Sequence, residues 1–305
     1  MAASDRSDPI LGGLDGILPD LEDFYKALRA HPELSMQEER TSGKVAERLE
    51  AAGFEVTTGV GKTGVVGLLE NGEGPTVMLR ADMDALPVKE NTGLPYASNE
   101  TATDREGNEV PVAHACGHDM HTTCLVGVTT LLARATDAWS GTLIAVFQPA
   151  EGARAMIDDG LFDRFPKPEV VLGQHVMPAP AGVVSYRAGT TQAASDSLQV
   201  RMFGRGGHGS MPESTVDPVV MAASTVMRLQ TVVSREIAAT DAAVLNVGSL
   251  QAGTKANVIP DEATIKLNVR TFDEGVRKSV LGAIERIVNA ESEAWDAPNG
   301  RRSPR

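Results

Sequence analysis

The chain has 305 residues, of which 42% are hydrophobic and 23% charged, which is the balance of an ordinary globular protein with room for two domains. Its formal net charge of −13 argues against a protein that binds nucleic acid non-specifically, because such a protein needs a basic face. The sequence has no apolar run of the roughly 18 residues that cross a membrane, and its two cysteines, eight residues apart, are expected as free thiols, so we expect a soluble cytoplasmic protein.

The first half of the sequence predicts helices that alternate with buried strands. PDLEDFYKALRAHPEL predicts a helix that begins near Pro19 or Asp20 and is stopped by Pro32. ERTSGKVAERLEAAGFEV predicts a second helix, which Gly53 ends before a strand. Three apolar segments follow, each ending in polar residues: TVMLRADMDALP, GTLIAVFQPAEG and EVVLGQHVMP. This alternation favours an α/β fold with a largely parallel sheet.

Polar residues at the strand ends mark one edge of this predicted sheet. In open α/β sheets, ligands bind beyond the carboxyl ends of the strands. A helix expected from Gly117 to Ala135 also starts from a polar loop. The residues that we expect to converge at this edge are Asp82, Asp84, Glu151 and His175.

From about residue 189 the pattern changes. SLQVRMFG predicts a strand, and DPVVMAASTVMRLQTVVSR predicts a long apolar helix opened by Asp217 and Pro218. AAVLNVGSLQAG and ATIKLNVRTF predict two further strands, and DEGVRKSVLGAIERIVNA predicts a second helix. This order is one strand short of a ferredoxin-like fold. We therefore expect a first domain over 1–188, a smaller α+β domain over 189–300 and a basic tail over 301–305.

The stretch HACGHDMHTTC, from His114 to Cys124, holds three of the six histidines and both cysteines. Each residue alone has an ordinary structural explanation, since free cysteine is commonly buried. Together, a C-x-H pair and a following helix offer thiolate and imidazole ligands that suit Zn²⁺ and related ions. The spacing lacks the second pair of a structural zinc finger. The stretch therefore predicts a metal site, with Cys124 more suited to the core.

A hydrolytic metal site also needs a general base beside the attacking water. Glu151, which follows an apolar strand and Pro149, is the candidate. A carboxylate at that position also suits the first turn of a helix, where the macrodipole favours it. His175 follows the run VVLG, and only its place at a third strand end favours a ligand over an ordinary polar residue.

Seven motifs in order resemble the M20 metallopeptidase family over about residues 20–295. They are HPELSMQEERTS, LRADMDALP, HACGHDMHT, FQPAE, GQHVMP, GRGGHGSMP and ANVIPDEA. The pattern is similar to the amidohydrolase branch of that family, which includes aminoacylase, hippurate hydrolase and auxin-conjugate hydrolase types. The resemblance implies a zinc-exopeptidase-like α/β catalytic domain with an inserted ferredoxin-like lid that is often used for dimerisation.

The resemblance also implies two divalent ions (Zn, Mn, Co or Ni) and hydrolysis of the amide bond of an N-acyl amino acid or a related conjugate. Glu151 would take the proton of the attacking water, and His208 in the lid would stabilise the oxyanion. Homodimers formed through the lid are implied as well. Carried over by motif are Cys116, His118 and His175 as metal ligands, Glu151 as base, Asp84 as the acidic residue that orients the site, His208 at the substrate carbonyl, and Asn257 and Arg270 at the substrate carboxylate.

The sequence departs from the family pattern at two places. Family members carry two adjacent glutamates after QPA, a base and a ligand, but here Gly152 follows Glu151. The family also continues beyond the lid with a part of the catalytic domain that carries a last histidine ligand, whereas this chain ends in APNGRRSPR. A degenerate, non-catalytic homologue that binds metal or dimerises is therefore one alternative. A peptidase of the same family is another, although the cysteine motif favours the amidohydrolase branch.

Overall fold

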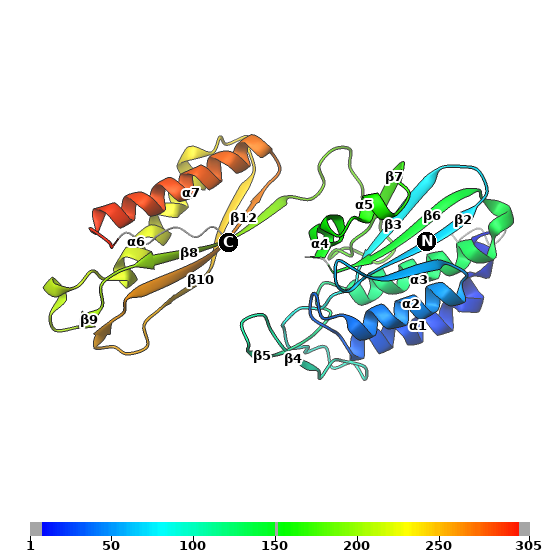
Figure 1. The fold of residues 1–305 in the computed structure, drawn as a ribbon, viewed down its shortest axis with the longest axis horizontal. Helices are drawn as coiled ribbons and strands as arrows, with labels where there is room; N and C mark the ends of the chain where they lie inside the picture. The colour runs from blue at the N-terminus through cyan, green and yellow to red at the C-terminus, as the bar shows by residue number, and fades with distance from the viewer. Residues whose placement is uncertain (1–7, 150–151, 299–305) are drawn as a thin grey trace. The chain divides into compact units, whose positions relative to one another are not determined.

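A computed structural model describes residues 8–149 and 152–298 of the chain. Contacts within the chain divide it into two compact units, residues 1–183 and 184–305. In Figure 1 the first unit runs from blue to green and the second from green to red, and each has its own sheet and helices. Among the described residues, no helix is long and apolar enough to cross a membrane.

The sheet of the first unit has five strands in the order β1-β2-β6-β3-β7. β3 pairs in parallel with β6 and with β7, whereas β1–β2 and β2–β6 are antiparallel. The prediction of a largely parallel sheet is therefore wrong for half of the pairs, because a tight turn folds β2 back along β1 where the sequence suggested no hairpin. The strands are β1 (Glu55–Val60), β2 (Gly64–Asn71), β3 (Thr76–Asp82), β6 (Gly141–Gln148) and β7 (Val170–Gly173).

Helices cover both faces of this sheet. Alternate residues of β6 point to opposite faces: Phe147 belongs to the core formed with α1, α2 and α3, and Ile144 belongs to the core formed with α4 and α5. Both side chains are fully buried. The helices are α1 (Leu14–Ala30), α2 (Glu39–Ala51), α3 (His118–Arg134), α4 (Ala153–Asp158) and α5 (Leu161–Arg164).

The start of α1 differs from the prediction. The helix begins at Leu14, after a 3₁₀ turn over Leu11–Gly13, and Pro19 lies inside it. Ile17 is already part of the buried stripe, with Leu21, so burial extends the helix past the proline even though the proline cannot donate a backbone hydrogen bond. The predicted strands after Gly53, from Thr76, before Glu151 and before His175, and the helix from Gly117, are all present.

The second unit has a three-stranded antiparallel sheet in the order β10-β12-β8. The order strand, helix, strand, strand, helix confirms the predicted one. Asp217 caps the first helix by accepting a hydrogen bond from the Val219 amide at 2.8 Å, and the helix ends in a π turn over Val232–Glu236. The elements are β8 (Ala194–Phe203), α6 (Pro218–Thr231), β10 (Ala243–Ala252), β12 (Glu262–Thr271) and α7 (Glu274–Ala294).

Short elements complete the described chain. In the first unit, β4 (Thr101–Thr103) and β5 (Glu109–Pro111) form a small ribbon, and a 3₁₀ turn covers Thr136–Ala138. In the second unit, β9 (Gly207–His208) pairs with β11 (Val258–Ile259), and a 3₁₀ turn covers Pro212–Ser214. The sequence did not indicate either ribbon, because strands of two or three residues carry no clear alternation.

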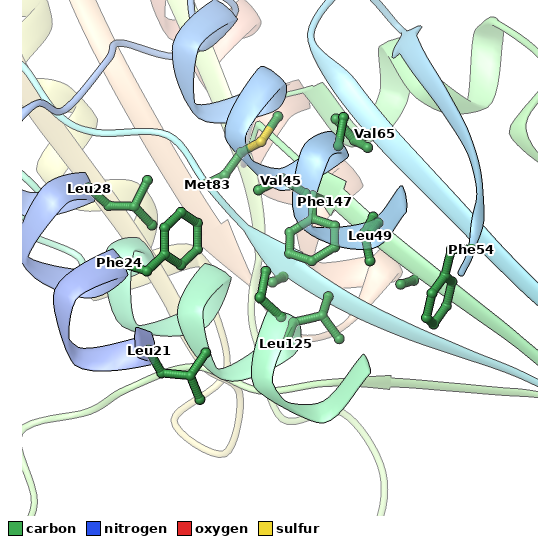
Figure 2. Packing of buried hydrophobic residues seen from close by; sticks show 14 of the residues in the cluster. Leu21, Phe24, Leu28, Val45, Leu49, Phe54, Val65, Met83, Leu125 and Phe147 are labelled. Atoms are coloured by element: carbon green, nitrogen blue, oxygen red, sulfur yellow. The ribbon is translucent and has the colours of Figure 1, made fainter. Parts of the chain in front are cut away.

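Phe147 tests the core of the first unit. Figure 2 shows its ring among Val45, Leu49 and Leu125. We expect Phe147→Ala to lower the free energy of unfolding by about 3–5 kcal/mol, because the substitution leaves a cavity. Phe162, which is 44% exposed, supplies the control: Phe162→Ala should cost less than about 1 kcal/mol. Urea unfolding in a Trp295→Phe background, followed by Trp139 fluorescence, measures both. Equal losses would contradict this packing.

Candidate metal centre

Three segments meet at the carboxyl edge of the parallel strands. β3 ends at Asp82, which lies opposite Gln148 at the end of β6. β7 pairs with the other side of β3 and ends at Gly173, two residues before His175. The bonds between His118 and Asp84 and between His121 and Val176 then bring the start of α3 to the same edge. The predicted convergence at this edge is therefore present for the described residues.

Four side chains at this edge form a group that could hold a metal ion: Asp82, His118, His121 and His175. Each offers one ligand atom, and these atoms lie within 4.8 Å of one another. The imidazole rings are close, with centroid distances of 4.6 Å for His121–His175 and 5.3 Å for His118–His121. Imidazole and carboxylate donors suit Zn²⁺ and related divalent ions, so the chemistry of the group fits the predicted metal.

Asp84 fixes the orientation of His118. The Nδ1 of His118 lies 2.9 Å from the Asp84 backbone oxygen and 3.0 Å from Asp84 Oδ1. A carbonyl can only accept, so Nδ1 carries the proton and Nε2 keeps its lone pair for a cation. Burial lowers the pKa of His118, but the hydrogen bond and the charge of Asp84 outweigh it and raise that pKa. The predicted orienting residue thus contacts a predicted ligand.

The backbone of Val176 contacts the other two histidines. His175 Nδ1 donates to the Val176 carbonyl at 2.7 Å, which leaves His175 Nε2 with a free lone pair. The Val176 amide donates to His121 Nε2 at 2.9 Å. Burial, followed by the neighbouring His175 and His118, lowers the pKa of His121 to about 4. His121 is therefore neutral at physiological pH.

The Asp82 carboxylate accepts hydrogen bonds from two side chains of the protein. Arg80 Nη1 donates to Asp82 Oδ2 at 2.9 Å, and Gln148 Nε2 donates to Asp82 Oδ1 at 3.2 Å. These contacts hold the carboxylate at the end of β3 and offset part of its charge. Each carboxylate oxygen keeps a further lone pair, so Asp82 can still bind a cation without losing either partner.

A buried ion-pair network connects the start of α3 to neighbouring segments. Asp119, in the first turn of the helix, accepts from Arg29 Nη1 at 3.0 Å, and the same guanidinium donates to Glu90 at 2.7 Å. The two carboxylates are almost completely buried, with exposed side-chain fractions of 1% and 3%. Losing one partner would leave a buried charge unpaired. The network therefore ties the histidine-bearing helix to α1 and to the loop after β3.

The remaining predicted residues of the first unit have mixed outcomes. His118 and His175 come together, but Cys116 is not a member of the group of four and stays a prediction. Burial, with the charges of Asp84 and Asp82, raises the pKa of the Cys116 thiol, so a nearby cation is needed to make it a ligand. Glu151 lies outside the described residues. Gly152 is described, and a Cβ there would lie 2.8 Å from the Pro149 ring, so a glutamate would be crowded at the position where the family has its second one.

The lid residues lie in the second unit. His208 pairs with Val258 across the β9–β11 ribbon, and the Gly209 amide donates to the Asn257 carbonyl at 2.9 Å, so the ribbon brings His208 and Asn257 together. The Ser210 amide donates to His208 Nδ1 at 3.2 Å, which leaves the proton on His208 Nε2.

Arg270 does not join these residues. It lies eight residues after Glu262 along β12, a distance of about 27 Å at 3.4 Å per residue. Glu262 is next to Asp261, whose side chain accepts a hydrogen bond from the Gly206 amide beside the β9–β11 ribbon. Arg270 therefore lies at the other end of its strand, where its Nε donates to Asn268 at 3.2 Å.

Two members of the group were not predicted as site residues. His121 lies three residues after His118, so helical periodicity places both on one face of α3. Asp82 ends β3 and was expected at this edge, without an assigned role. Given the predicted helix and the predicted strand, the spacing in the sequence was sufficient to identify both residues.

Comparison with known proteins gives consistent results. The profile described as "Peptidase family M20/M25/M40" matches residues 78–283. A hippurate hydrolase of Campylobacter jejuni is 41% identical over 283 residues, which cover 91% of this chain and 71% of that protein. An N-acyl-L-amino acid amidohydrolase of Geobacillus stearothermophilus is 38% identical over 93% of this chain and 75% of its own. The crystal structure of a dinuclear metal binding peptidase from Bacillus subtilis is 30% identical, with a TM-score of 0.69 over 93% of this chain and 72% of that one.

The lowered pKa of His121 makes the stability of the metal-free chain depend on pH. Between pH 6.5 and about 4 the unfolded chain binds a proton at this residue and the folded chain does not, so wild type loses stability as the pH falls through this window. Glutamine does not titrate. We therefore expect wild type to lose up to about 3 kcal/mol relative to His121→Gln. Urea unfolding in the presence of a chelator measures the difference, and parallel pH profiles would contradict the assignment.

Proposed function

The chain belongs to peptidase family M20/M25/M40, and on this premise we propose that it is a metal-dependent amidohydrolase that cleaves the amide bond of N-acyl amino acids or related conjugates. The observation that carries this proposal is the group of three imidazoles and one carboxylate within 4.8 Å at the edge of the parallel strands. The hippurate hydrolase and the N-acyl-L-amino acid amidohydrolase among its relatives support the substrate class.

Different residues of the chain would have different roles in such a reaction. A bound divalent ion supplies Lewis acidity and lowers the pKa of water. His118 and His175 offer Nε2 as ligands, and Asp84 keeps His118 in the required tautomer. Glu151 takes the proton of the attacking water and returns it to the leaving amine. His208, which carries its proton on Nε2, donates to the carbonyl oxygen as negative charge develops there.

We also propose that two ions bind, drawn from Zn²⁺, Mn²⁺, Co²⁺ and Ni²⁺. Asp82, His118 and His175, from the group of four, would provide ligands for one of them. A second ion needs further donors, and Cys116 is the one that the motifs supply. Asn257 would contact the substrate carboxylate, and Arg270 stays a predicted contact of the same group. We further propose a cytoplasmic homodimer that forms through the second unit.

A direct test is hydrolysis of N-acetyl amino acids, benzoylglycine and dipeptides by the purified, metal-loaded chain. Turnover of the first two classes with little turnover of dipeptides supports the proposal. Turnover of dipeptides alone favours the peptidase alternative. The similarity of this chain to the dinuclear metal binding peptidase of Bacillus subtilis is the observation behind that alternative. If none of these substrates is hydrolysed, the result favours the non-catalytic alternative. The crowding that a side chain would meet at Gly152 is the observation behind that alternative.

Glu151→Gln tests the general base. Glutamine keeps the size of the side chain but cannot accept the proton, so kcat should fall by at least about 100-fold, with metal content nearly unchanged. Glu73→Gln, at an exposed turn residue, is the matched control and should leave kcat as in wild type. The base assignment is wrong if Glu151→Gln keeps its activity.

Cys116→Ser tests the predicted sulfur ligand. Serine removes the thiolate and nearly preserves the volume, so we expect less zinc or cobalt per chain after gel filtration, measured by elemental mass spectrometry. The control is Cys124→Ser, at the other free cysteine, which lies within α3 and should retain its metal. Unchanged metal content in Cys116→Ser would remove Cys116 from the ligand set.

A further inference from the structure

The backbone of one residue, Val176, contacts two of the three histidines at the candidate centre. The Val176 carbonyl accepts from His175 Nδ1 at 2.7 Å, and the Val176 amide donates to His121 Nε2 at 2.9 Å. His121 lies in α3 and His175 follows β7, so the second bond joins elements that are 55 residues apart. This single hydrogen bond links the helix to the loop that carries His175.

The hydrogen bond from the Val176 amide determines which nitrogen of the His121 ring carries the proton. Because Nε2 accepts the hydrogen bond from the Val176 amide, the ring's own proton is on Nδ1. That Nδ1 is buried and has no hydrogen-bond partner among the described residues. Neither nitrogen then keeps a free lone pair. His118 and His175 differ, because each donates from Nδ1 to an oxygen and leaves Nε2 free.

A second contact fixes Val176 against the start of α3. Gly117 has a φ of +74°, and a Cβ at that position would lie 2.6 Å from Val176 Cγ2. The valine side chain therefore sits where only glycine allows it. Side-chain packing on Gly117 and hydrogen bonding to His121 together hold Val176 in place. His175 precedes Val176 in the chain and donates to its carbonyl through Nδ1.

We propose that His121 is a positioning residue, which holds His175 in place through the Val176 amide, and that it is not a metal ligand. This inference rests on the proposed function, since it assumes that His175 binds an ion. His121 then acts as an outer partner of a ligand, and such partners commonly tune metal affinity by 10- to 100-fold. The group of four accordingly reduces to two imidazole ligands and one carboxylate, leaving open positions for Cys116, substrate and water.

The discriminating substitution is His121→Gln. Glutamine Oε1 lies close to the position of histidine Nε2 and can accept from the Val176 amide, but a neutral amide is a poor ligand for Zn²⁺ or Co²⁺. His121→Leu is of similar size and has no acceptor. His118→Gln is the matched control, because it applies the same substitution to a residue that the structure leaves free to bind metal.

Two measurements follow on each variant. Cobalt titration of the full chain, followed by the visible d–d spectrum, gives the Kd and the ligand field. Amide hydrogen exchange at Val176 in the metal-free chain reports the Val176–His121 bond without any metal. We expect His121→Gln to keep the wild-type Kd, spectrum and Val176 protection. His121→Leu should weaken cobalt binding by about 10- to 100-fold and should speed Val176 exchange.

Each outcome decides the proposal. If His121→Gln loses cobalt as His118→Gln does, His121 is a ligand and the proposal is wrong, whether or not His121→Leu folds. If Val176 exchanges equally fast in wild type and in His121→Leu, the proposed contact does not exist. If wild type binds no cobalt, the proposed function fails, and faster exchange in His121→Leu would still support the contact between His121 and Val176.

Discussion

The parallel pairing of β3 with β6 and β7 is the constraint on which the candidate site depends. Parallel strands end at the same edge, so Asp82 and the loop that carries His175 come together although they are about ninety residues apart in sequence. α3 then adds His118 and His121 from one helical face. A change in register at β7 would move His175 away from the other two imidazoles, so the strand pairing and the metal chemistry are coupled.

Hydrogen bonds around the histidines decide what each ring can do. Asp84 and the Val176 carbonyl take the Nδ1 protons of His118 and His175, so these rings present Nε2. The Val176 amide uses the lone pair of His121 instead. His121 thus differs from the other two histidines of the cluster, and the backbone of one valine accounts for much of the difference. The buried pairing of Arg29 with Asp119 also connects the start of the helix to α1.

Much of this arrangement could be predicted from the sequence, because it depends on local patterns. The apolar strands with polar ends and the HACGHDMH loop identified the edge, and His118 and His175 meet there. The antiparallel hairpin of β1 and β2 was not expected, because pairing partners are a property of the whole fold. The early start of α1 was also missed, since burial of Ile17 overrides the effect of Pro19. The contact of His121 with Val176 is between distant residues, and no local pattern predicts it.

The central claim is that this edge of the sheet binds a divalent ion through His118 and His175. Metal stoichiometry tests it most directly, by elemental mass spectrometry of the purified chain after growth with added zinc, manganese or cobalt. We expect at least one ion per wild-type chain and almost none in a folded His118→Gln, His175→Gln double variant. A metal-free wild-type chain, or a double variant that keeps its metal, would contradict it.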